Sequence, residues 1–246
     1  MVRQQKNVHI IPMGLEIDRV IAGLKQYPTN YAVFIYGTNT KLDVEQKARI
    51  NGKKIEKMIN ATVTVKNEYI DYNDFNIAFN KLFDIFRSLR KEGYTIYLNL
   101  SSGSSVIGSA ALIVSFMTGA VPYYVYPSRY NVSKTTTVLS KGFENIIQLP
   151  TMMIETPDEQ EIMVLRALNK MGDGVEKQNE LIGDLEENGF FPPRKEKEDQ
   201  ARYTARKRAK LNRTLFNLGS KNLVELKKKG RNVKVTLTPS GLLFSG

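Results

Sequence analysis

The stretch IYLNLSSGSSVIGSAALIVSF, residues 96–116, joins a short apolar run to a long one through a cluster of small residues. Residues 96–100 are typical of a buried strand, and residues 104–117 have the length and apolar character of a buried helix. Four serines and one glycine stand between them, at residues 101–105. In an open α/β sheet the ligand lies outside the carboxyl ends of the strands, where such a loop would be found.

The alternation of strand and helix continues in both directions from this stretch. Strands are predicted at residues 8–12, 31–36, 61–65, 94–100, 121–126 and 145–149, and helices at 15–26, 42–59, 74–91 and 104–117. This alternation, with nearly all-apolar strands, predicts an α/β fold of the Rossmann-like kind, a parallel sheet with helices on both faces. We expect residues 130–149 to add an antiparallel hairpin at the sheet edge.

The pattern changes after Pro157. Helices are predicted at 158–171, 176–188 and about 200–218, followed by strands at 224–227 and 233–237 around a basic turn. Three helices and a hairpin in this order predict a carboxy-terminal winged helix-turn-helix domain. We therefore expect two domains, with ligand sensing and dimerisation in residues 1–152 and DNA binding in residues 153–246.

Charge separates the carboxy-terminal part of the chain into two regions. Residues 151–193 contain 3 Lys and Arg against 10 Asp and Glu, whereas residues 194–246 contain 15 against 4. The basic excess therefore falls on the third helix and the hairpin. Since the whole chain carries a net charge of +11, a polyanionic partner is indicated, and double-stranded DNA is the one that fits a winged helix.

The third helix of this domain has one apolar stripe, formed by Leu211, Leu215 and Leu218 at spacings of four and three residues. Such a helix fits a major groove, and a basic hairpin tip suits phosphates. The residues expected to contact DNA are Arg206, Lys207, Lys210, Arg213, Thr214, Lys227, Lys228, Lys229 and Arg231. Two alternatives stay open: a solvated helix face, and a winged helix that binds protein.

Composition excludes several kinds of site. The chain has no Cys, which removes disulfides, thiolate metal sites and cysteine nucleophiles, and its one His is His9. The serine cluster is not followed by Gly-Lys-Ser/Thr, and it fits neither G-x-G-x-x-G nor G-x-S-x-G. We expect no catalytic residue, metal or cofactor. Because Gly119 and Pro122 divide the apolar run 106–126, we expect no membrane span and a cytoplasmic protein.

The serine cluster is therefore interpreted as a binding loop. Small hydroxyl residues at a helix N-terminus offer backbone N–H groups and the positive end of the helix dipole to a phosphorylated ligand. Two other strands end in similar residues, and the expected ligand contacts are Met13, Gly14, Gly37, Thr38, Asn39, Ser101, Ser102, Gly103, Ser104 and Ser105. Capping of the helix by Ser104 or Ser105 is the structural alternative, and it is compatible with binding.

Two motifs resemble the CARF (CRISPR-associated Rossmann fold) domain: VHIIPMGLEIDRVI at residues 8–21 and NLSSGSS at residues 99–105. The fourth-strand motif of that family is often N-x-T-G-G-T-K. Asn99, Ser101, Ser102, Gly103, Ser104 and Ser105 match its ligand loop, which adds Asn99 to the expected contacts. The departures are Ser for Thr, Ser104 for the second Gly, and Val106 for a frequent Lys.

A CARF domain joined to a winged helix is similar to archaeal CRISPR-associated transcription regulators, and the similarity covers essentially the whole chain. It implies a homodimer that binds a cyclic oligoadenylate across its two-fold axis. The ribonuclease branch of the family carries an Arg-x(4–6)-His motif and is excluded, since no His follows residue 9. Two alternatives remain: a ring nuclease that degrades the cyclic nucleotide, and an adaptor whose winged helix binds protein.

Overall fold

The computed structural model describes residues 6–71, 73–131, 140–152, 154–172, 175, 178–229 and 232–246. The chain divides into two compact units, Met1–Ile154 and Glu155–Gly246. Each unit has a hydrophobic core of its own.

The first unit is built on a six-stranded sheet in the order β3-β2-β1-β4-β5-β8. All neighbouring strands are parallel except β5 and β8. The strands are β1 (Asn7–Pro12), β2 (Tyr31–Gly37), β3 (Thr64–Ile70), β4 (Thr95–Asn99), β5 (Val121–Tyr126) and β8 (Asn145–Gln148). The helices are α1 (Ile17–Gln26), α2 (Asp43–Ile59), α3 (Phe75–Lys91) and α4 (Ser105–Thr118).

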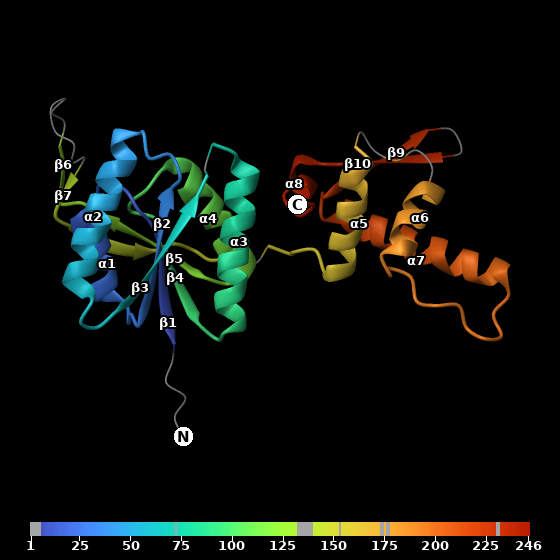
Figure 1. Ribbon diagram of the computed structural model, residues 1–246, viewed down its shortest axis with the longest axis horizontal. Coiled ribbons are helices and arrows are strands. Elements are labelled where there is room, and N and C mark those ends of the chain that lie inside the picture. Colours follow the sequence, from blue (N-terminus) through green and yellow to red (C-terminus); the bar gives the residue numbers. More distant parts are fainter. Residues whose placement is uncertain are drawn as a thin grey trace, which may run out of the picture. The chain divides into compact units, whose positions relative to one another are not determined.

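Helices cover both faces of this sheet, with α1 and α2 on one side and α3 and α4 on the other (Figure 1). The predicted Rossmann-like fold class is thereby confirmed. β1 is the central strand, and all six of its residues are buried. The chain crosses to β2 on one side of β1 and from β4 to β5 on the other, so the order reverses between β1 and β4. Ligands of open α/β sheets bind at such a switch point.

Two details of the sheet differ from the prediction. The third strand lies at Thr64–Ile70, later than the predicted 61–65, because it pairs only with β2 at the sheet edge and carries polar residues where an apolar run was expected. The predicted edge hairpin at 130–149 supplies one strand to the sheet, β8, antiparallel to β5. The short strands β6 (Arg129–Tyr130) and β7 (Ser140–Lys141) pair with each other in a separate sheet.

The second unit contains three helices, a β hairpin and a final short helix. They are α5 (Glu159–Lys170), α6 (Gln178–Glu187), α7 (Gln200–Ser220), β9 (Val224–Lys229), β10 (Asn232–Leu237) and α8 (Pro239–Leu242). A reciprocal pair of 2.9 Å backbone hydrogen bonds joins Val175 to Val235 of the hairpin. This is the architecture of a winged helix, as predicted. The short helix α8 was not predicted from the sequence.

Candidate ligand cavity and nucleic-acid interface

The loops after β1 and β4 touch each other at two glycines. A Cβ atom added to Gly14 would lie 2.6 Å from the backbone N of Gly103 and 2.9 Å from Ser102 Oγ. A Cβ atom added to Gly103 would lie 2.5 Å from Pro12 Cβ, and the φ angle of Gly103 is +87°, a conformation that side chains disfavour. Only glycine fits these two positions, so the two strand ends are held in direct contact.

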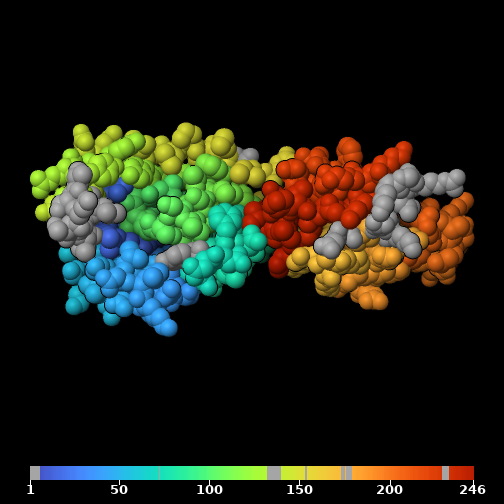
Figure 2. Space-filling view, turned by 90° about the horizontal axis from the view of Figure 1, so that it is seen from above, coloured from blue at the N-terminus to red at the C-terminus, as the bar shows by residue number. Residues whose placement is uncertain are grey.

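A cavity of about 590 Å³ opens beside this contact. This volume is within the range of small-molecule and nucleotide sites. Figure 2 shows the dark-blue chain near the end of β1 in a hollow between the light-blue segment that includes α2 and the green segment that includes α4. The lining residues are Met13, Gly14, Leu15, Glu16, Arg19, Val44, Glu45, Ala48, Ser101, Ser102, Gly103, Ser104, Tyr130 and Asn131.

Several residues of the serine loop serve to hold the loop in place. Asn99 is fully buried and does not line the cavity; its Oδ1 accepts a 2.8 Å hydrogen bond from the backbone N of Ser101. Ser101 Oγ accepts from the backbone N of Val125 at 2.7 Å. Ser104 caps α4, since its Oγ accepts from Ile107 N at 3.3 Å. The capping alternative is therefore correct for Ser104, and Asn99 and Ser101 fasten the loop to the sheet.

The residues expected to bind ligand after β2 do not line this cavity. Gly37 N donates to Glu45 Oε2 at 3.0 Å, and Gly37 O accepts from Arg49 Nη2 at 2.6 Å. Thr38 and Asn39 are exposed on the same turn. β2 lies one strand away from the switch point between β1 and β4, and on this side the cavity is lined by Val44, Glu45 and Ala48 of α2. Ser105 lines a smaller cavity of about 310 Å³ on the α4 side of the loop.

Two cavity residues that the sequence analysis missed are charged and buried. Arg19 is 5% exposed; its Nε donates to Val125 O at 2.7 Å, and its guanidinium lies 4.7 Å from the ring centre of Tyr124. Glu16 is 8% exposed, and its Oε2 accepts from Ser140 Oγ. Both residues come from the start of α1, three positions apart and directly after the β1 loop. That spacing was the available signal, because residues i and i+3 share one helix face.

Three polar atoms at the cavity are buried without a hydrogen-bond partner among the described residues: Glu16 Oε1, Arg19 Nη2 and Ser102 Oγ. Buried polar groups are nearly always paired in folded proteins, and an unpaired one costs free energy. Three of the residues that line the cavity therefore each keep one buried polar atom unpaired. Arg19 also supplies a cation to a site whose loop has Val106 where a Lys is frequent in the CARF motif.

The single histidine is not part of this cavity. His9 is fully buried in β1, stacked on Tyr97 at 5.2 Å, with its Nδ1 3.0 Å from Tyr123 Oη. Burial lowers the pKa of His9 to about 3, so the imidazole is neutral at physiological pH. Burial also raises the pKa of the Tyr123 phenol, which keeps the hydroxyl protonated. His9 therefore belongs to an aromatic cluster in the core of the first unit.

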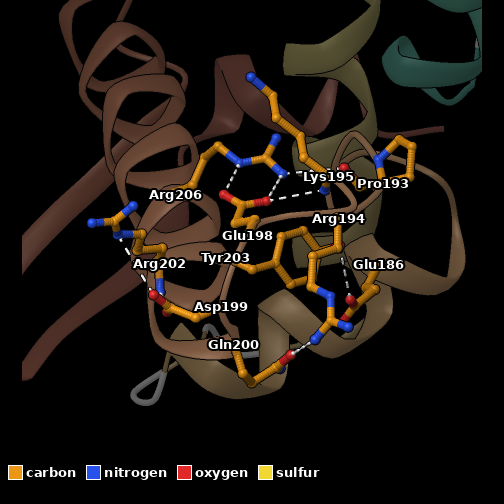
Figure 3. Close-up of polar contacts among 10 residues, drawn as sticks. All are labelled: Glu186, Pro193, Arg194, Lys195, Glu198, Asp199, Gln200, Arg202, Tyr203 and Arg206. Carbon is orange, nitrogen blue, oxygen red and sulfur yellow. Dashed lines mark hydrogen bonds and ion pairs between the residues drawn. The ribbon is translucent and has the colours of Figure 1, made fainter.

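In the second unit, α7 buries the predicted stripe of Leu211, Leu215 and Leu218. Four other residues expected to contact DNA are engaged inside the domain. Figure 3 shows Arg206 paired with both carboxylate oxygens of Glu198, at 3.0 and 2.7 Å. This pairing lowers the pKa of the Glu198 carboxyl.

The other three are also held by the domain itself. Lys207 is 9% exposed, bonds Glu186 at 2.8 Å and lies over the Tyr203 ring at 4.8 Å. Lys210 Nζ donates to Phe190 O at 2.6 Å, and burial lowers the pKa of Lys210. Thr214 Oγ1 donates to the carbonyl of Lys210 at 3.1 Å. The contacts of Arg206, Lys207 and Lys210 fasten α7 to the segment 186–198, whereas the Thr214 bond lies within the helix.

The remaining predicted DNA contacts lie on the outside of the unit. Arg213 is exposed and has no ion-pair partner among the described residues. Lys227 and Lys228 are exposed on β9, and Lys227 bonds Glu225 at 3.0 Å. Lys229 ends β9, and its side chain lies outside the described residues, as does Arg231. The structure therefore leaves fewer free cations on α7 than the sequence suggested.

Both units match known families. Residues 7–130 match the model described as "HFX_2341_N:-like, N-terminal". The chain belongs to this family. Residues 160–244 match the "DUF6293 C-terminal winged helix domain". The predicted combination of a Rossmann-like domain with a carboxy-terminal winged helix is confirmed by the fold of the two units and by the winged-helix match.

An uncharacterized protein of Archaeoglobus fulgidus is 24% identical over 242 residues, which are 96% of each chain. Among solved structures, Can2 from Sulfobacillus thermosulfidooxidans in complex with cyclic tetra-adenylate is 12% identical, with a TM-score of 0.40 and 98% of this chain covered. Enterococcus italicus Csm6 bound to cyclic hexa-2'-fluoro-hexa-dAMP is 11% identical, with a TM-score of 0.44 and 89% covered. This chain spans 64% and 57% of those two chains.

The described part of the chain contains no group of three or more His, Asp or Glu side chains placed to hold a metal ion. It also contains no helix that is long and apolar enough to cross a membrane.

Proposed function

We propose that this protein is a ligand-responsive DNA-binding regulator, in which the cavity of the HFX_2341_N-like unit takes a cyclic oligoadenylate-type nucleotide and the winged helix binds double-stranded DNA. The observation that carries the ligand half is the set of three unpaired buried polar atoms, Glu16 Oε1, Arg19 Nη2 and Ser102 Oγ, at one cavity. A phosphate fits Arg19 and Ser102, since both can donate to it. The hydroxyl or amino groups of a nucleoside fit the Glu16 carboxylate as donors.

The cyclic form of the ligand rests on the resemblance of the serine loop to the CARF ligand loop. A ring with two-fold symmetry presents the same groups twice, which matches two copies of one cavity in an isologous homodimer. We therefore expect one ring per two chains. The DNA half rests on the winged-helix fold and on the 15 Lys and Arg against 4 Asp and Glu in residues 194–246. Ligand binding would act on DNA affinity by changing the separation of the two recognition helices.

Calorimetric titration with cyclic tetra- and hexa-adenylate tests the ligand half. The variant is Ser102→Ala, which removes a hydroxyl that has no hydrogen-bond partner among the described residues, so that the folded protein loses no hydrogen bond. The matched control is Ser105→Ala, three positions along the same loop and outside the larger cavity. Ser102→Ala should weaken binding roughly tenfold, the value of one hydrogen bond to a charged group. Absence of binding to either ring, or equal weakening by both variants, would contradict the proposed site.

The same samples separate the two alternative functions. Chromatography of the ligand after incubation would show linear products if the protein were a ring nuclease. DNA affinity measured at several salt concentrations should fall with a slope of roughly −0.9 per phosphate contacted. An adaptor that binds only protein would show no such salt-dependent affinity, and identical DNA affinity with and without bound ring would refute the coupling.

A further inference from the structure

The exposed face of α7 shares only Arg213 with the DNA contacts that the sequence predicted on this helix. Residues at the repeat of an α-helix form one outer stripe, and all of them are exposed: Arg202, Ala205, Ala209, Arg213, Phe216 and Ser220. Phe216 has 71% of its surface exposed, the largest value among the large hydrophobic side chains described as exposed. The outer stripe therefore combines arginines, alanines and one solvent-facing aromatic ring.

The charges around the outer stripe indicate a negatively charged partner. Residues 200–220 contain no Asp or Glu, and β9 adds exposed Lys227 and Lys228. A protein partner in contact with this surface would need a matching acidic face, whereas a duplex supplies negative charge on both sides of its groove. Alanine at 205 and 209 leaves the helix backbone uncovered, so that the helix can approach the groove floor closely. The surface is therefore complementary to DNA in charge, and its small alanine side chains leave room for close approach.

An aromatic ring at such a position has one specific target in the major groove. The 5-methyl group of thymine is the apolar feature that a base pair presents there, and a Phe side chain can contact it. We propose that Phe216 is a specificity-determining residue that reads thymine methyl groups, while Arg213 holds the helix in register. This inference rests on the proposed DNA binding and adds a base preference to it. The residues engaged inside the domain, Lys207 and Lys210 among them, position the helix and do not read bases.

The test compares duplexes that contain thymine with duplexes in which uracil replaces it, because uracil lacks only the 5-methyl group. Tight binders are first selected from a random-sequence duplex pool with the full-length protein. Their affinities are then measured in both forms for the wild type, Phe216→Ala and Arg213→Ala. The wild type should prefer thymine by roughly three- to tenfold, the effect of one or two buried methyl groups. Phe216→Ala should lose this preference, and Arg213→Ala should keep it while binding more weakly at every salt concentration.

The outcomes separate the inference from the function on which it rests. If the wild type binds no duplex with a salt-dependent affinity, DNA binding itself is wrong and the inference falls with it. If the wild type binds DNA but the thymine-to-uracil ratio is near one, or persists in Phe216→Ala, then Phe216 does not read methyl groups. Mass photometry measures whether Phe216→Ala changes the oligomeric state of the protein. A change from dimer to monomer in Phe216→Ala would assign the outer stripe to a contact between chains and would overturn the inference.

Discussion

Acidification should destabilise the first unit through His9. The unfolded chain binds a proton with a pKa of 6.5, whereas burial lowers the pKa of His9 in the folded chain to about 3. Between these values unfolding takes up a proton, so the free energy of unfolding falls as the pH falls. Each pH unit below 6.5 costs about 1.4 kcal/mol, which gives a loss of about 2 kcal/mol at about pH 5 relative to neutral pH.

Tyrosine near-UV circular dichroism provides an assay that reports on this unit. Eleven of the 12 tyrosines precede residue 131, so the signal follows the first unit with little contribution from the winged helix. Urea unfolding at neutral pH and at about pH 5 would be compared between the wild type and His9→Asn, whose amide can replace Nδ1 at Tyr123 without titrating. The wild type should lose about 2 kcal/mol more than the variant. Equal losses in the two proteins would refute the assignment of a neutral buried imidazole.

Two further predictions follow from contacts at the two sites. Gly14→Ala places a methyl group 2.6 Å from Gly103 N. The variant should bind the cyclic oligoadenylate more than about tenfold more weakly in calorimetry, while its DNA affinity without ligand stays unchanged. Normal binding of the cyclic oligoadenylate would contradict the loop contact. Lys207→Met should change DNA affinity less than about twofold in fluorescence anisotropy, because Lys207 already bonds Glu186. Arg213→Ala should reduce the magnitude of the salt slope of DNA affinity by about one. A salt slope that falls in Lys207→Met and stays unchanged in Arg213→Ala would instead support Lys207 as a DNA contact.

For the fold, the sequence was informative because its cues are local and periodic. The apolar strands and amphipathic helices of the first unit follow from spacing alone, and so do the three helices and the hairpin of the second. The strand that was misplaced, β3, is the polar one at the sheet edge, where burial on two faces no longer enforces an apolar run. The short helix α8 was missed because a four-residue helix has too few positions to show a period.

For the proposed ligand site, the sequence predicted the loops after β1 and β4, which line the cavity, but also the loop after β2, which does not. The contact between Gly14 and Gly103 requires β1 and β4 to be neighbours, and strand order is a tertiary property. In this strand order the β2 loop lies away from the cavity, and Glu16 and Arg19 line it. The three-residue spacing of Glu16 and Arg19 was the signal in the sequence, but spacing alone does not show whether the two side chains are buried or solvated.

For the winged helix, the sequence determined the total charge and the buried stripe of α7, since both depend on composition and spacing. It could not determine which cations stay free. Arg206, Lys207 and Arg208 are consecutive in the sequence, yet Glu198 and Glu186 neutralise the first two. Pairing depends on which acidic groups the fold brings within hydrogen-bond distance, and those groups lie up to 21 residues away along the chain. Only the tertiary structure therefore decided that Arg206 and Lys207 are neutralised while Arg213 keeps no ion-pair partner among the described residues.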